Sequence, residues 1–248
     1  MWCHTPRLFP KGLRAGFTSA IAPEGFSGAR FTFDLRGEGE SADSVLSREW
    51  LLNDCQLSEQ AWCDAHQVHG DRLIECTPEG NNTREQADAL WTRTPGTLLA
   101  IRTADCVPLL LTSTEIPLAI AIHAGWRGTH QRIVSKVVKA VVEELGVSPS
   151  SLLGVIGPAI HSRAFEVDAD VSVPFHEVYG DAVVQKTPGK SARWNVDLIK
   201  ANQRELLESG LAPQHIEVID LCTFENSHFW SHRRQRDGAG RQVAWIAL

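Results

Sequence analysis

Three residues with metal-binding side chains stand where apolar stretches of the chain meet turns. His69 lies in a Gln-Val-His-Gly segment, Cys106 in Thr-Ala-Asp-Cys-Val-Pro, and His123 in His-Ala-Gly-Trp-Arg-Gly. Two imidazoles and one thiolate suit zinc, and three protein ligands leave a fourth position open to water or substrate. An open position indicates chemistry rather than a purely structural metal. We therefore predict that His69, Cys106 and His123 hold one catalytic zinc ion.

Four further residues are candidates for the surroundings of this site. Asp105 directly precedes Cys106 and could orient a ligand or take a proton from water, although an Asp here also suits an ordinary turn. Gln67, in the same Gln-Val-His-Gly segment as His69, is a candidate substrate-binding residue. Arg127 and Arg233 are candidates for binding an anion such as phosphate, and the plain alternative for each is a solvated surface arginine.

The same atoms allow other chemistries. Cys106 could act as a nucleophile with His123 as its base and Asp105 or Glu166 as the orienting group, which would make a metal-free cysteine hydrolase. A copper-dependent phenol oxidase is less favoured, because the ten histidines include no His-x-His pair and a multicopper site needs many clustered imidazoles. Zinc is therefore the expected metal, with copper the less favoured one.

Strand-length apolar stretches bounded by Gly, Pro and polar residues are the elements that must position these side chains. Most are too uniformly apolar for a sheet with one wet face, so we expect strands covered on both faces by helices or a second sheet. These stretches are residues 16–21, 61–68, 98–103, 107–112, 118–123, 152–156, 215–222 and 242–248.

Helical periodicity is clearest over residues 129–145, where Gly146 supplies the stop, and is also present over 196–208 and 43–53. The first of these helices would start directly after Gly-Trp-Arg-Gly, so its free amides favour an anion close to His123. The expected fold is mixed α/β, with central, largely buried sheets flanked by helices, in a single domain over residues 1–248.

The overall composition limits the partners of the chain. With 248 residues, a net charge of −6 and a pI near 5.9, it has no general basic field for nucleic acid. A local cluster suits a small anion instead; it comprises Arg233, Arg234, Arg236 and Arg241. The sequence shows neither a secretory signal nor an apolar run of membrane-spanning length, so we expect a cytoplasmic protein with small-molecule substrates and no obligate protein partner.

The six cysteines form no Cys-x-x-Cys pair. In a reducing compartment most of them should be buried free thiols. Cys106 is the one with other metal ligands in its predicted surroundings.

Taken together, these motifs resemble the laccase-domain or polyphenol oxidase family, whose members have also been described as zinc-containing purine nucleoside phosphorylases with adenosine deaminase side activity. The resemblance runs in order from about residue 60 to the C-terminus. It includes the three segments above, Ala87-Asp88-Ala89, Gly157-Pro158-Ala159-Ile160, Phe165-Glu166-Val167, Cys222-Thr223, and Phe229 through Arg234 to Gly240-Arg241.

The resemblance implies His69, Cys106 and His123 as zinc ligands and phosphorolysis of a purine nucleoside (inosine, adenosine or methylthioadenosine), with adenosine deamination as a further activity. It also admits a role in the fidelity of peptidoglycan precursors, which is linked to some bacterial relatives. The N-terminal third departs from the family, because Ser19-Ala20 stands where the family usually has Thr-Arg. If that arginine contacts substrate in relatives, the specificity of this chain differs from theirs.

Overall fold

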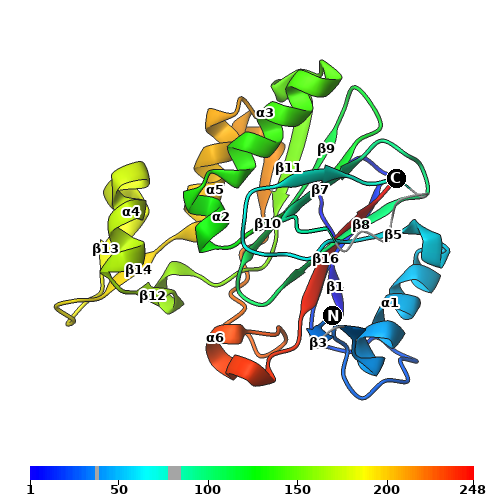
Figure 1. The fold of residues 1–248 in the computed structure, drawn as a ribbon, viewed down its shortest axis with the longest axis horizontal. Helices are drawn as coiled ribbons and strands as arrows, with labels where there is room; N and C mark the ends of the chain where they lie inside the picture. The colour runs from blue at the N-terminus through cyan, green and yellow to red at the C-terminus, as the bar shows by residue number, and fades with distance from the viewer. Residues whose placement is uncertain (37–38, 78–84) are drawn as a thin grey trace.

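The computed structural model describes residues 1–36, 39–77 and 85–248, and two large sheets form its centre (Figure 1). The first has the strand order β1-β2-β16-β8-β5, and the second has the order β15-β11-β9-β10-β7-β6. The first sheet consists of β1 (Cys3–His4), β2 (Arg14–Thr18), β16 (Gln242–Ala247), β8 (Leu98–Thr103) and β5 (Trp62–Cys63). The second consists of β15 (Ile216–Val218), β11 (Leu152–Ile156), β9 (Val107–Ser113), β10 (Ala119–Ala124), β7 (Ala89–Thr92) and β6 (Leu73–Glu75).

Two smaller sheets and six α-helices complete the described part of the chain. The small sheets are β12 (Glu166–Val167), β14 (Trp194–Val196) and β13 (Val184–Lys186), and the pair β3 (Leu35–Arg36) and β4 (Gly39–Glu40). The helices are α1 (Ala42–Asp54), α2 (Trp126–His130), α3 (Ile133–Leu145), α4 (Ala169–Tyr179), α5 (Leu198–Glu208) and α6 (His232–Gln235).

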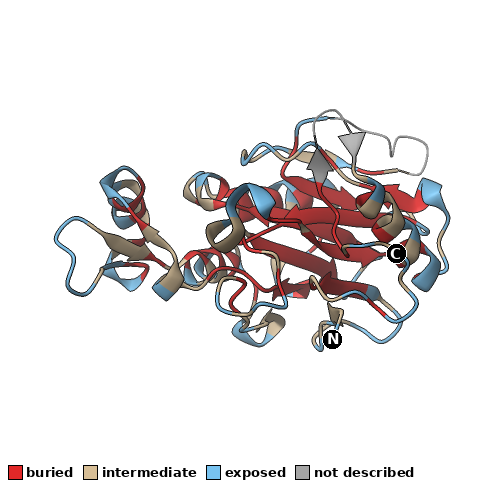
Figure 2. Ribbon diagram, turned by 90° about the horizontal axis from the view of Figure 1, so that it is seen from below, coloured by how far each residue is buried: buried red, intermediate tan, exposed pale blue. Residues whose placement is uncertain are grey.

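Alternate residues of the central strands enter different apolar cores, which explains why these strands are apolar throughout. In β8, Leu99 and Ile101 join the core between the two large sheets, whereas Leu98 and Ala100 join the core that also contains residues of α1. In the second sheet, Leu110 belongs to the core between the sheets, and its neighbours on either side face the core shared with α3 and α5. The layers therefore run from helix through two sheets to helices, and the strands are mostly buried (Figure 2).

The sequence-based prediction of a mixed α/β fold with both strand faces covered is confirmed. Several strands match their predicted ranges closely, with 98–103 and 152–156 reproduced as β8 and β11. The predicted strand over 61–68 is wrong beyond its start, because β5 ends at Cys63 and a loop follows. That loop carries His69, whose backbone amide donates to the Asp88 carboxylate and not to a neighbouring strand.

The helix predicted over 129–145 is two helices. Arg132 adopts a left-handed conformation (φ 61°) between α2 and α3, which breaks the continuous helix that the periodicity indicated. Gly146 ends α3 in the left-handed region as predicted. The sequence did not predict α4, since Pro174 lies inside it and proline ordinarily argues against a helix interior.

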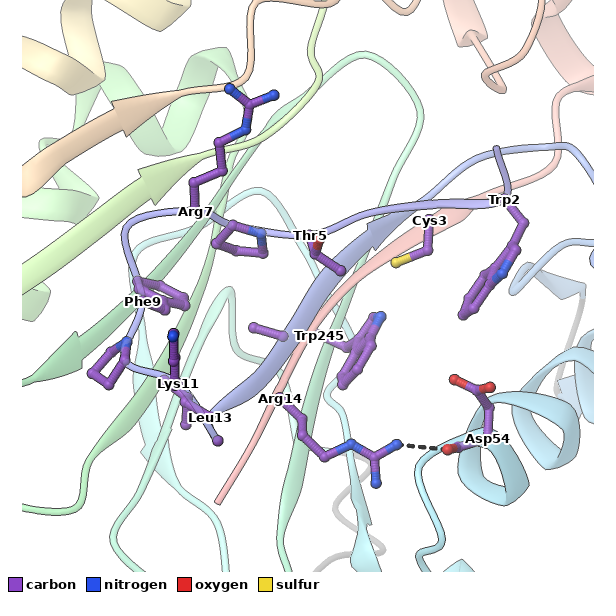
Figure 3. Close-up of a pocket in the computed structure, with 14 residues that line it drawn as sticks. Trp2, Cys3, Thr5, Arg7, Phe9, Lys11, Leu13, Arg14, Asp54 and Trp245 are labelled. Atoms are coloured by element: carbon purple, nitrogen blue, oxygen red, sulfur yellow. Dashed lines mark hydrogen bonds between the residues drawn. The ribbon is translucent and has the colours of Figure 1, made fainter.

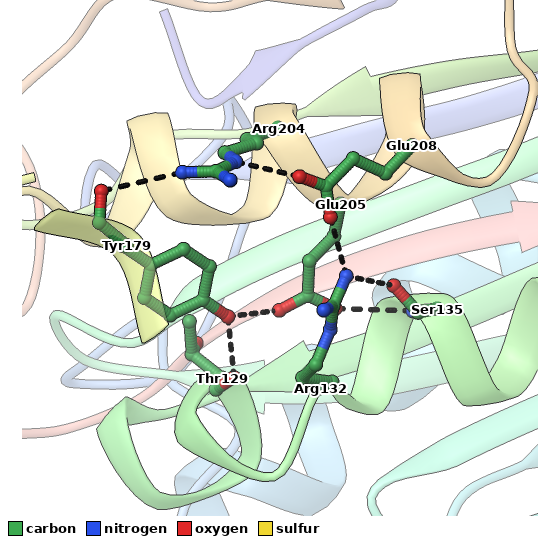
Figure 4. A network of polar contacts seen from close by, with 7 residues as sticks. All are labelled: Thr129, Arg132, Ser135, Tyr179, Arg204, Glu205 and Glu208. Carbon is green, nitrogen blue, oxygen red and sulfur yellow. Dashed lines mark hydrogen bonds and ion pairs between the residues drawn. The ribbon is translucent and has the colours of Figure 1, made fainter. Parts of the chain in front are cut away.

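A polar network joins α2, α3, α4 and α5 (Figure 4). The buried Glu205 of α5 accepts a hydrogen bond from the backbone amide of Ser135 in α3 (3.0 Å) and also contacts the hydroxyl of Tyr179 in α4. The same Tyr179 hydroxyl lies 2.9 Å from the carbonyl oxygen of Thr129 in α2. This network fixes α2, which begins three residues after His123, against the longer helices.

The cysteines differ in part from the prediction. Cys63 and Cys76, both buried, form a disulfide that links the end of β5 to the residue after β6. The other four are free thiols, of which Cys55 and Cys222 are buried and Cys3 and Cys106 are half-buried. Sequence spacing gave no sign of the disulfide, because its cysteines are separated by 13 positions and come together only through the sheets.

Two further observations concern the surface. Within the described ranges, none of the helices combines the length and apolar character needed to span a bilayer. A pocket of about 590 Å³ lies between the N-terminal segment and β16, lined by Trp2, Arg7, Phe9, Arg14 and Trp245 among others (Figure 3). Its lining includes none of the candidate site residues, so the chemistry is better sought at the ends of the central strands.

Candidate metal centre

The three predicted ligands come together in space. His69 lies in the loop between β5 and β6, Cys106 in the turn from β8 to β9, and His123 in β10 near its end. Their ligand atoms all lie within 4.8 Å of one another, and the two imidazole rings are 4.9 Å apart at an interplanar angle of 76°. His123 is buried, Cys106 half-buried and His69 exposed, so the cluster is open to solvent on the side of His69.

Asp88, directly before β7, holds the segments of His69 and His123. Its carboxylate accepts hydrogen bonds from the backbone amides of Val68 (3.1 Å), His69 (2.9 Å) and Gly70 (2.7 Å). It also lies 2.7 Å from Nδ1 of His123. This contact occupies one ring nitrogen and leaves Nε2 for the cluster, which is the arrangement that carboxylates give to metal-binding histidines.

The backbone at the centre is shaped for close approach. His69 and Asp105 both have positive φ values, 60° and 95°, a conformation that costs non-glycine residues energy and is concentrated at functional sites. Gly125, the N-terminal cap of α2, has no room for a side chain. A Cβ there would lie 2.7 Å from Cδ2 of His69 and 3.2 Å from Sγ of Cys106.

The electrostatics of the cluster favour a thiolate. Burial alone would raise the pKa of the Cys106 thiol, but the adjacent His123 and His69 outweigh it and lower that pKa. Burial alone would lower the pKa of His123, whereas the Cys106 thiolate and Asp88 raise it. Burial alone would raise the pKa of Asp88, but His123 and the hydrogen bonds from the loop amides outweigh it and hold that pKa below the ordinary value. The deprotonated thiol is the form that binds metals or acts as a nucleophile.

Asp105 ties the Cys106 turn to the C-terminal part of the chain. Its buried carboxylate accepts hydrogen bonds from the Thr223 hydroxyl (2.7 Å), the Ser231 hydroxyl (3.0 Å) and the Arg233 backbone amide (2.6 Å). These contacts are those of a residue that positions the neighbouring Cys106. The sequence had suggested Asp105 or Glu166 as the group that orients His123, and in the structure the contact to His123 is made by Asp88 instead.

The side chains of the other candidate residues make contacts of different kinds. The amide side chain of Gln67 pairs with the backbone of Arg102 at both ends (2.8 and 2.7 Å), which fixes the loop before His69 on β8. Arg127 is exposed, with its guanidinium 4.3 Å from the centre of the Trp126 ring.

Arg233 is half-buried beside the Phe165 ring, and its Nη1 donates to the carbonyl oxygen of Glu166 (2.9 Å). Burial lowers its pKa. The adjacent Arg234 is used structurally, because its guanidinium donates to backbone carbonyl groups, including that of Thr223 (2.8 Å). Of this arginine pair, Arg233 is therefore the better candidate for a ligand contact.

Asp88 is the functional candidate that the residue patterns did not reveal. It belongs to the Ala87-Asp88-Ala89 segment of the family resemblance, but nothing in that segment alone assigns a role. The available signal was a carboxylate directly before an apolar strand, which becomes buried with that strand and must find donors there.

The fold and the cluster define a mixed α/β protein with a His-Cys-His centre at the joined ends of two sheets. The chain belongs to the family described as multi-copper polyphenol oxidoreductase laccase, whose family model matches residues 24–248. It is 33% identical over 223 residues to purine nucleoside phosphorylase YlmD of Bacillus subtilis, covering 86% of this chain and 80% of that one. It is 39% identical over 184 residues to the purine nucleoside phosphorylase of Deinococcus radiodurans, covering 74% of this chain and 68% of that one.

A solved structure shares this fold. The crystal structure of Bacillus licheniformis hypothetical protein YfiH superposes with a TM-score of 0.87 and 29% sequence identity. The superposition covers 95% of this chain and 92% of that one. The likeness thus extends over the N-terminal region, where the sequence resemblance was weakest.

Proposed function

We propose that this protein is a zinc-dependent enzyme that cleaves purine nucleosides by phosphorolysis. The observation that carries the proposal is the convergence of His69, Cys106 and His123, with ligand atoms within 4.8 Å of one another. The names of relatives that cover most of the chain support the substrate class. The donor set also fits zinc, since imidazole nitrogens and a thiolate are its usual ligands and Asp88 orients one imidazole.

In this scheme a phosphate oxygen forms a bond to the anomeric carbon of the sugar while the bond from that carbon to the purine nitrogen breaks. When bound, zinc would supply a Lewis acid that polarises an oxygen atom of a substrate or of water. The residues of the chain supply position: Asp88 holds His123 and the His69 loop, and Asp105 holds the Cys106 turn. Such fixed geometry reduces the entropic cost of bringing two substrates together.

The phosphate would be bound by guanidinium groups. Arg127 lies two residues after Gly125, which touches the cluster, and its exposed side chain is free to turn toward an anion. Arg233 is fixed to Asp105 through its backbone amide and so moves together with the Cys106 turn. Both can donate paired hydrogen bonds to phosphate oxygens.

The experiment is base release from inosine and adenosine with and without phosphate, together with metal analysis. The native protein should release free base only with phosphate present, and Cys106→Ser should lose both this activity and the zinc of the cluster. Cys55→Ala is the matched control, because Cys55 is a buried free thiol in the core around α1. Full phosphorolysis by Cys106→Ser would reject the proposal. Ammonia release from adenosine, measured in parallel, tests the further deaminase activity.

A metal-free cysteine hydrolase is the second candidate, and one observation favours it. Cys106, His123 and Asp88 have the order of nucleophile, base and orienting carboxylate, with Asp88 2.7 Å from Nδ1 of His123. Iodoacetamide separates the two candidates. It should alkylate Cys106 slowly in the zinc protein and rapidly after a chelator is added, whereas a hydrolase would be alkylated rapidly from the start.

Oxidation of phenols by a multicopper centre is not proposed. Over the part of the chain that the structure describes, two groups of potential metal ligands are found, and the richer in histidine has two. A blue copper site plus a trinuclear cluster needs many more imidazoles than that.

A further inference from the structure

A second group of potential metal ligands lies outside the centre described above. It consists of His161, Cys222 and Glu225, whose ligand atoms also lie within 4.8 Å of one another. His161 follows the turn after β11, and the other two precede α6, so the group is assembled from two distant segments. It is independent of the His69 cluster and of the activity proposed for it.

The scaffold of this second group is already built. Residues 159 and 222 pair as an isolated parallel bridge, with hydrogen bonds from the Ala159 amide to the Leu221 carbonyl (3.2 Å) and from the Thr223 amide to the Ala159 carbonyl (3.1 Å). The backbone amide of His161 points at the sulfur of Cys222 at 3.4 Å. An amide that donates to sulfur stabilises a thiolate, the form in which cysteine binds metals.

One ring nitrogen of His161 is buried without a hydrogen bond. Its Nε2 is buried and makes no hydrogen bond, although it lies 3.3 Å from a carboxylate oxygen of Asp220. A buried polar atom without a hydrogen bond costs free energy, and binding a cation would offset that cost. Asp220 is largely exposed and stands beside the ring, so it can supply a fourth ligand.

Arg163 is the group that competes with a cation at this place. It lies two residues after His161, and its guanidinium pairs with both carboxylate oxygens of Glu225. Arg163 is 66% exposed, and an ion pair this exposed contributes little to stability, so the side chain can move into solvent. Glu225 would then be free to turn toward the sulfur and the imidazole.

We propose that His161, Cys222 and Glu225, with Asp220 at the rim, form a second site for a divalent cation of the zinc class. A thiolate, an imidazole and carboxylates are the donors that zinc and cobalt(II) accept together. The site would clamp the turn after β11 to the segment before α6. That segment carries Thr223, which donates to Asp105 next to Cys106, so the second cation would stabilise the neighbourhood of the first site.

The test uses the full chain with the first site disabled by Cys106→Ser and cobalt(II) as the probe. The metal-free variant should bind one equivalent of cobalt(II), with the near-ultraviolet absorption band of a thiolate bound to cobalt, and its Tm should rise. Adding Cys222→Ser should abolish the band and the rise. His161→Ala changes a half-buried residue and is therefore less apt to disrupt folding than a change at the buried Cys222. It should weaken cobalt(II) binding at least about tenfold.

Arg163→Ala gives the sharpest readout, because it removes the competitor. Cobalt(II) should bind more tightly to this variant than to its parent, whereas loss of an ion pair that was merely structural would not improve binding. The proposal is overturned if Cys106→Ser protein shows no thiolate–cobalt band, or if Cys222→Ser leaves that band unchanged. Because the first site is absent throughout, the outcome does not depend on the proposed phosphorylase activity.

Discussion

Two buried carboxyl groups, Asp88 and Glu205, have surroundings that shift their pKa values in opposite directions. Asp88 accepts bonds from three amides and from the His123 ring, and these partners hold its pKa below the ordinary value despite burial. Glu205, in the helical layer, accepts from the Ser135 amide, contacts the Tyr179 hydroxyl and lies near the Arg132 guanidinium, but burial outweighs these partners and raises its pKa. Burial alone therefore does not set the direction of a pKa shift, because nearby hydrogen-bond donors and charges also contribute to it.

Proton counting supports a neutral Glu205. The Tyr179 hydroxyl lies close to two acceptors, the Thr129 carbonyl and the Glu205 carboxyl group, but it has only one proton to donate. If Glu205 is protonated, it donates to Tyr179 and Tyr179 donates to Thr129, so each of the two contacts of the Tyr179 hydroxyl drawn in Figure 4 has its own proton. Asp88 thus serves the site, whereas Glu205 serves the packing of the helices.

The largest effect is expected from Asp88→Asn. An amide offers one acceptor oxygen where four donors converge, so the His69 loop and the His123 ring both lose partners. Zinc affinity and base release should fall by about 10–100-fold, as for other changes to carboxylates that orient metal-binding histidines. Metal titration and the phosphorolysis assay measure this loss. The control is Asp71→Asn, since Asp71 lies in the His69 loop but pairs with the exposed Lys136. Unchanged affinity in Asp88→Asn would refute the assigned role.

Gly125→Ala should have the next largest effect, and it concerns the His69, Cys106 and His123 cluster alone. The added methyl group would press on the His69 ring at 2.7 Å, so one ligand must move. We expect weaker zinc binding with little change in Tm, measured by metal titration and thermal unfolding. Gly238→Ala is the matched control, because its Cβ would have nothing within 4 Å. Native affinity in Gly125→Ala would show that the cluster is looser than described.

Tyr179→Phe perturbs the surroundings of Glu205 without touching the His69, Cys106 and His123 cluster. It removes the hydroxyl between Thr129 and Glu205 and leaves buried polar groups without it, which should cost about 1–3 kcal/mol of unfolding free energy. Denaturant unfolding measures the loss, and zinc affinity should stay close to native. A loss of zinc without a loss of stability would mean that the surroundings of Glu205 and the metal-binding cluster are not separate.

The smallest effect is expected from Glu205→Gln, and it concerns pH dependence. The folded pKa of Glu205 lies above its ordinary value of 4.5, so the folded state retains a proton that the unfolded state has released. This group therefore contributes a loss of stability as pH rises from about 4.5 through the folded pKa. Glutamine cannot ionise and keeps both bonds, so unfolding curves across this range should lose that slope. A slope identical to native would mean that Glu205 is not neutral.

The sequence predicted that His69, Cys106 and His123 come together, because their residue types and strand-end positions are local properties. It also predicted the covered sheets, since alternate residues of β8 and β10 fill different cores and both sets must be apolar. Asp88 was not predicted as an orienting residue, because its four donors come from two distant segments and its own neighbours are two alanines.

The remaining misses have similar causes. The break between α2 and α3 depends on one left-handed residue, Arg132, within an otherwise continuous apolar periodicity. The disulfide depends on how β5 and β6 lie in separate sheets, and α4 tolerates Pro174 in its interior. Each is decided by tertiary contacts that a local pattern does not contain.

Anomalous diffraction at the zinc edge, on crystals of the native protein grown with zinc, tests the metal centre most directly. We predict a peak within bonding distance of Cys106 Sγ and of one nitrogen each of His69 and His123, with Asp88 still bound to Nδ1 of His123. Crystals that contain zinc elsewhere but show no peak between these three side chains would contradict it.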